Sequence, residues 1–182
     1  MREDELYKTQ NIFFKPIVLK LGNNAKLKVG ENNIFHPMVY IVSDGGDIII
    51  GNFNVFEEKT FIYNKSKTSP MIVGDANYFK IGARIQSCGV GNLNEFGINS
   101  YADGCLIGNC NIIGADSKLK PNNQLMDKKT VSFNGNIADN LIYDEARRKK
   151  MISLMIKKTY ELYKRLITQR MERTSQVPAQ RS

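Results

Sequence analysis

One five-residue pattern recurs along much of the chain and constrains its fold more than any other feature. It consists of an aliphatic residue, a glycine, two variable residues and an asparagine. Its full copies begin at Val29, Ile50, Val73, Val90 and Ile107, and a weaker copy begins at Leu21. The full copies start 21, 23, 17 and 17 residues apart, and each continues in steps of about six residues. Such a hexapeptide repeat is typical of a β-solenoid.

Each six-residue step predicts one short flat strand and one corner of a triangular prism. Three steps close a coil of roughly 17–18 residues, and neighbouring coils pair as parallel strands about 4.8 Å apart. Glycine and asparagine beside the corners fit this geometry, because both accept left-handed or tight backbone. The sequence therefore predicts an all-β fold, a single-stranded parallel β-helix.

Stacked coils place equivalent residues over one another. We expect an internal aromatic column, which would be formed by Phe35, Phe56, Phe79 and Phe96 and continued by Ile113. We also expect an amide ladder at one corner, formed by Asn33, Asn54, Asn77, Asn94 and Asn111. Stacked amides can hydrogen-bond along the axis of such a fold.

The repeat divides the chain into four segments. They are an N-terminal segment (1–20), the hexapeptide-repeat β-helix (21–136), a C-terminal amphipathic basic helix (139–173) and a flexible tail (174–182). The two longer intervals carry polar, turn-rich insertions at 43–47 and 64–70, which we expect to protrude from corners as loops. No uninterrupted apolar run is long enough for a membrane span. The cysteines form no Cys-x-x-Cys pair, so we expect neither a disulfide framework nor a zinc site.

The C-terminal segment carries most of the positive charge. Residues 139–182 contain 11 basic and 5 acidic residues, so 11 − 5 = +6 of the net charge of +8 lies there. Either Asp139 or Asp144 is expected to cap the helix. Its apolar stripe would pack on the solenoid or on a partner. The residues that we select for partner contact are Met151, Met155, Leu162 and Leu166.

Several stretches resemble the dynactin subunit 6 family. They are Ile34-Phe35-His36-Pro37, the run from Gly46 to Glu58, the run from Pro70 to Phe79, the run from Ala102 to Gly108, and residues 122–136. The resemblance covers roughly residues 21–142. The order of the coils, the placement of the two insertions and the Ile-Gly…Glu-Glu block carry it, because hexapeptide steps alone are shared by many enzymes.

This resemblance implies a left-handed β-helix followed by a C-terminal helix. It also implies a non-enzymatic scaffold subunit of the dynactin pointed-end complex that supports dynein-dependent transport along microtubules. The implied partners are dynactin subunit 5, which is a second β-helix, an actin-related protein and dynactin subunit 4. The implied location is cytoplasmic and cytoskeleton-associated. We expect no cofactor, no metal, no small-molecule substrate and no membrane insertion.

Two enzyme classes share the hexapeptide fold and were weighed against the scaffold. A γ-class carbonic anhydrase needs three histidine ligands for zinc, whereas this chain contains only His36. The alternative function is a hexapeptide-repeat acyltransferase acting as a homotrimer, in which His36 could serve as the general base. We expect His36 to be a surface residue without an orienting acid, and Glu57 and Glu58 to be charges on the outer face.

A third possibility starts from the basic helix. Its charge could tether the chain to an anionic membrane or to nucleic acid. No nucleic-acid motif accompanies the charge and aromatic residues are sparse among the cations, so nucleic acid is not an expected partner.

Overall fold

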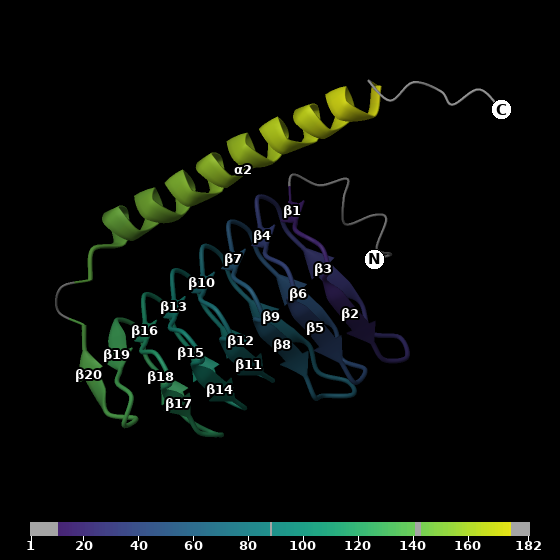
Figure 1. Ribbon diagram of the computed structural model, residues 1–182. Helices are drawn as coiled ribbons and strands as arrows, with labels where there is room; N and C mark the ends of the chain where they lie inside the picture. Colours follow the sequence, from purple (N-terminus) through teal and green to yellow (C-terminus); the bar gives the residue numbers. More distant parts are fainter. Residues whose placement is uncertain (1–10, 88, 141–142, 176–182) are drawn as a thin grey trace.

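The chain winds as a left-handed parallel β-helix of about 6 coils, with one long helix running along its outside (Figure 1). The computed structural model describes residues 11–87, 89–140 and 143–175. Each coil contributes one strand to each of three sheets, which form the faces of a prism. Helix α2 (Glu145–Ser175) follows the last coil.

Three sheets, named A, B and C here, make the faces. Sheet A contains β1 (Ile12–Phe13), β4 (Ile34–Phe35), β7 (Val55–Phe56), β10 (Tyr78–Phe79), β13 (Glu95–Phe96), β16 (Ile112–Ile113), β19 (Lys129–Val131) and β20 (Ile137–Asp139). Sheet B contains β2 (Val18–Leu21), β5 (Tyr40–Ser43), β8 (Phe61–Asn64), β11 (Arg84–Gln86), β14 (Tyr101–Asp103) and β17 (Lys118–Leu119). Sheet C contains β3 (Leu27–Val29), β6 (Ile48–Ile50), β9 (Met71–Val73), β12 (Gly89–Val90), β15 (Leu106–Ile107) and β18 (Gln124–Leu125).

The predicted β-helix is confirmed, and it begins one coil earlier than the repeat suggested. Strand β1 pairs in parallel with β4, with Ile12 opposite Ile34 and Phe13 opposite Phe35. This coil lacks the glycine of the repeat, so the five-residue pattern does not mark it in the sequence. At the other end β20 pairs antiparallel with β19 and covers the last edge of sheet A.

Aromatic rings form one continuous stack inside the prism. The rings of Phe13, Phe35, Phe56, Phe79 and Phe96 stack in order, with centroids 4.7, 4.8, 4.8 and 4.5 Å apart. Ile113 follows opposite Phe96 in the register of sheet A. All of these side chains are buried. The column therefore has the predicted members, with Phe13 added at the start.

Asparagine side chains form a second stack. Each side-chain nitrogen donates to the side-chain oxygen of the asparagine in the preceding coil, at 3.1 Å from Asn33 to Asn11, Asn54 to Asn33, Asn77 to Asn54 and Asn94 to Asn77. The same nitrogens also donate to glycine carbonyls of the following coil, as Asn77 does to Gly91 at 2.9 Å. These buried amides are thus satisfied by neighbouring coils, and that stabilises the register.

The glycine of the repeat is required by close contact between coils. A Cβ atom on Gly51 would lie 2.8 Å from the carbonyl oxygen of Gly74 and 2.2 Å from Asp75 Oδ1. Any larger residue would push the coils apart. The pattern of glycine followed by asparagine therefore encodes one corner of the prism.

Helix α2 packs across the outer face of sheet A. Asp144 caps it, because its side-chain oxygen accepts a hydrogen bond from the backbone of Arg147 at 2.9 Å. Met155, Ile156 and Tyr163 pack against a buried cluster formed by Ile12, Ile34 and Val55. The helix begins at Glu145 and not at the predicted residue 139, because Asp139 is the last residue of strand β20 in sheet A. Among the described residues, no helix combines the length and apolarity that crossing a bilayer requires.

An ion cluster fastens the start of α2 to the solenoid. Glu95 of β13 pairs with Lys80 at 2.5 Å and with Arg148 of α2. Burial opposes the ionisation of Glu95, but the two cations outweigh it and hold the pKa of this carboxyl below its ordinary value. The group is therefore ionised at neutral pH.

The variant Glu95→Gln should lower the free energy of unfolding by about 1–3 kcal/mol at pH 7, because it leaves the partly buried Arg148 without its carboxylate partner. A carboxyl with a lowered pKa contributes stability above its unfolded pKa of about 4.3. That contribution is lost as the pH falls through the lower folded value, so the two proteins should converge in acid. Thermal melts from pH 7 to pH 3 measure this, with Glu31→Gln as control, because Glu31 is exposed and forms no ion pair with the described residues. A difference in stability that does not narrow as the pH falls would contradict the ion cluster.

Removal of one ring from the aromatic column should leave a hole in the interior. We expect Phe79→Ala to cost roughly 3–5 kcal/mol of stability. The control is Phe133→Ala, because the Phe133 side chain is 76% exposed and should cost little. Urea unfolding followed by circular dichroism compares the two, and equal midpoints would rule out a structural role for the column.

Candidate functional site

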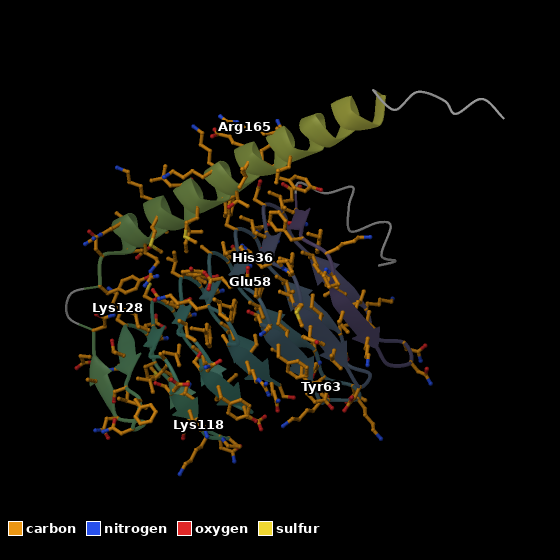
Figure 2. The ribbon with its side chains drawn as sticks, in the orientation of Figure 1. His36, Glu58, Tyr63, Lys118, Lys128 and Arg165 are labelled. Carbon is orange, nitrogen blue, oxygen red and sulfur yellow. The ribbon has the colours of Figure 1, made fainter. Side chains whose placement is uncertain are left out.

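His36 and Glu58 form a hydrogen-bonded pair at the corner between sheets A and B. Nδ1 of His36 lies 3.0 Å from Oε1 of Glu58. His36 follows the last residue of β4, and Glu58 follows β7 by two residues, so consecutive coils supply the two groups. They lie side by side below α2 (Figure 2). We name these two residues the His–Glu pair.

The carboxylate determines which ring nitrogen carries the proton. The hydrogen bond from His36 holds the pKa of the Glu58 carboxyl below its ordinary value, so Glu58 is ionised at neutral pH. An ionised carboxylate can only accept a hydrogen bond. Nδ1 of His36 must therefore donate. In the neutral ring this leaves the lone pair of Nε2 free to accept a proton.

Aromatic contacts hold the imidazole in place. The ring of Phe14 lies 5.5 Å from the His36 ring and 5.8 Å from the ring of Tyr163 on α2. The His36 side chain is 29% exposed and that of Glu58 is 42% exposed. The pair is thus oriented by neighbours and still reachable from solvent.

The structure corrects two expectations about these residues. His36 has an orienting acid, although none was expected, because Glu58 is 22 residues away and only the coil brings it close. Glu57 and Glu58 are also more than charges on an outer face. Glu57 accepts hydrogen bonds from the Tyr78 hydroxyl and, at 3.0 Å, from the backbone of Ile81. Burial and the hydrogen bond to Glu57 raise the pKa of Tyr78.

The four residues selected for partner contact do not share one environment. Met155 packs against the chain's own solenoid, so it belongs to the contact between α2 and sheet A. Met151, Leu162 and Leu166 are exposed. They remain predicted contacts for a partner. The ladder residues that we singled out lie inside the prism.

Metal ligands do not gather in the described part of the chain. Within residues 11–87, 89–140 and 143–175, no group of three histidine, cysteine, aspartate or glutamate side chains could hold a metal ion. Cys105 and Cys110 are buried, whereas Cys88 lies outside the described residues. Burial raises the pKa of Cys110.

Comparisons with known proteins bear on the fold. A Bacillus cereus protein of solved structure, described as a "putative acetyltransferase", matches with a TM-score of 0.68 and 17% sequence identity. The match covers 88% of this chain and 95% of that protein. No protein-family model and no curated protein matches the chain.

This similarity, at so low an identity, shows a shared fold. The expectation that this fold marks a non-enzymatic chain is corrected, because a protein that shares the fold over 95% of its length is described as a "putative acetyltransferase". The expectation came from the resemblance to dynactin subunit 6, and hexapeptide coils do not by themselves separate scaffolds from enzymes.

Proposed function

We propose that this protein is a hexapeptide-repeat acyltransferase in which His36 is the general base and Glu58 orients it. The observation that carries the proposal is the hydrogen bond between His36 Nδ1 and Glu58 Oε1. A histidine held in one tautomer by a carboxylate is the arrangement that activates hydroxyl nucleophiles in hydrolases. The fold shared with a protein described as a "putative acetyltransferase" supports the same chemistry.

The geometry suits transfer of an acyl group from a thioester to an amine or hydroxyl. Nε2 of His36 takes the proton from the acceptor as the acceptor nitrogen or oxygen attacks the carbonyl carbon. The new C–N or C–O bond gives a tetrahedral intermediate, and the C–S bond breaks when that intermediate collapses to the product carbonyl. The proton then passes from Nε2 to the departing sulfur and gives a free thiol. Glu58 remains ionised throughout and stabilises the imidazolium.

Association of chains belongs to the same proposal. The outer face of sheet C exposes Ile72 and Leu106, and Met126 follows beside them. A shallow groove runs along this face, and the missing side chain of Gly89 contributes to it. Exposed apolar groups in one flat patch favour burial against another chain. A homotrimer would bury three such faces.

The variant His36→Asn should lower kcat by roughly 10²–10⁴-fold, since it removes the base. Glu58→Gln should lower kcat less and should leave KM for the thioester nearly unchanged, because it affects only the tautomer and orientation of His36. The assay measures release of free thiol from acetyl-thioester donors in the presence of amine and hydroxyl acceptors. Glu31→Gln, an exposed carboxylate elsewhere on the solenoid, is the control. Full transfer by His36→Asn would refute the proposal.

A second candidate is a place in a larger assembly like that of the dynactin subunit 6 family. The exposed apolar face of sheet C favours it equally, because a second β-helix such as dynactin subunit 5 could pack there. An actin-related protein and dynactin subunit 4 would be neighbours, with a cytoplasmic, cytoskeleton-associated location. Sedimentation of the tagged chain from native extract separates the two. A particle of three chains supports the homotrimer, whereas a very large particle that contains a second hexapeptide subunit supports the assembly.

A further inference from the structure

A row of aromatic residues and one arginine faces outward from sheet B. The register of the sheet aligns Tyr40 with Phe61, Phe61 with Arg84, and Arg84 with Tyr101. The rings of Tyr40 and Phe61 are 6.0 Å apart and tilted by 46°. The guanidinium carbon of Arg84 lies 6.0 Å from the centroid of the Phe61 ring.

Tyr40, Phe61 and Arg84 line a groove that also reaches the corner of the His–Glu pair. The groove has a volume of about 340 Å³, and Met38, Tyr40, Lys59, Phe61 and Arg84 line it. Met38 comes two residues after His36, and Lys59 comes directly after Glu58. A hollow of this volume is within the range that small ligands occupy.

The two cations of this groove, Lys59 and Arg84, have no carboxylate partner in the described part of the chain. Other cations of the solenoid do have one: Lys65 pairs with Asp103 at 2.8 Å, and Lys80 pairs with Glu95. Lys59 and Arg84 enter no ion pair with any residue that the structure describes. The nearest acid in sequence, Glu58, is engaged by His36. The groove therefore carries positive charge that a bound anion could neutralise.

We propose that this groove binds a nucleotide, meaning a ligand that joins a planar aromatic ring to a phosphate group. The flat ring would stack on Tyr40 and Phe61, because aromatic platforms accept any nucleobase. The phosphate would meet Arg84, whose guanidinium fork matches phosphate oxygens, and Lys59 would add a second charge. The proposal is independent of the acyl-transfer chemistry assigned to His36.

The chemistry of the groove favours a single nucleotide over simpler ligands. An inorganic anion would use the two cations but would leave the two rings unused. An apolar ligand would use the rings but would leave the cations without a partner. Two cations also neutralise few phosphates, so a long nucleic acid strand would gain little from them.

The test is isothermal titration of the full chain with ADP, adenosine and inorganic phosphate. We expect ADP to bind and both fragments to bind at least tenfold more weakly. Arg84→Ala should weaken ADP binding at least about tenfold, and Phe61→Leu, which keeps an apolar side chain without a ring, should weaken it about fivefold or more. Lys118→Ala is the matched control, because Lys118 extends the same outward row two strands beyond Arg84. It should bind ADP as the unchanged chain does.

Several results would overturn the proposal. Phosphate that binds as tightly as ADP would show an anion site without base recognition. An oligonucleotide whose affinity rises steeply with length would indicate nucleic acid instead. A change of sedimentation in Arg84→Ala would indicate that copies of the chain bury this face. Melting curves establish that each variant is folded, and the exposed Arg84 should not affect them.

A competition experiment with coenzyme A identifies the source of the nucleotide. Coenzyme A carries an adenine nucleotide at one end, so it should compete with ADP if the groove holds part of an acyl donor. In that case Arg84→Ala should raise KM for the thioester without changing kcat, whereas His36→Asn should change kcat without changing ADP binding. If ADP binds and coenzyme A does not, the ligand is a free nucleotide. Both results support a nucleotide groove, and only the kcat of His36→Asn tests the acyltransferase.

Discussion

The hydrogen bonds between stacked asparagines hold the coils of this molecule in register, and the rest of the structure is built on those coils. Four of these amides donate to the asparagine of the preceding coil, as Asn77 does to Asn54 at 3.1 Å, and also to a glycine carbonyl of the following coil. In the last copy the buried side-chain nitrogen of Asn111 has no hydrogen-bond partner among the described residues. Buried amides that lose such partners cost free energy, so a coil that slipped by one residue would lose several bonds together. The coils can lie this close together because Gly51 has no side chain. A Cβ atom there would lie only 2.8 Å from the carbonyl oxygen of Gly74 in the next coil. The phenylalanine rings then stack with the same spacing from coil to coil.

This rigid register places side chains from different coils next to one another on the outside of the prism. His36 and Glu58 lie in different coils, and so do Phe61 and Arg84. In each case the parallel pairing of short strands brings together groups that are more than 20 residues apart in the chain. Because the strands are stiff and the coils cannot slide, the side chains at the corners are preorganised. A site on such a scaffold needs little reorganisation when it binds or reacts.

The same architecture accounts for the ambiguity between enzyme and assembly subunit. A β-helix has flat faces that pair well with other β-helices, and sheet C presents apolar side chains while sheet A is covered by α2. The core repeat serves either role, so the difference lies in a few outward residues. The His–Glu pair favours acyl transfer because a carboxylate that fixes one imidazole tautomer has a direct chemical use. The resemblance to dynactin subunit 6, by contrast, rests on features of the coils themselves.

The sequence by itself determined the fold, because a repeat of Gly and Asn with a large apolar residue at each step is local and periodic. Val29 to Ile113 could be placed in coils, with the phenylalanine and asparagine columns, from their spacing alone. The tertiary structure decided the first coil, where Asn11 and Phe13 extend both columns without the glycine of the repeat. It also decided the start of α2 after Asp144. Above all, it decided that His36 pairs with Glu58. The register of β4 and β7, continued by one residue, places His36 opposite Glu57. The carboxylate of Glu57, however, accepts a hydrogen bond from the hydroxyl of Tyr78 in the next coil. Which acid a side chain reaches depends on contacts from a third coil, and spacing along the chain carries no information about those contacts.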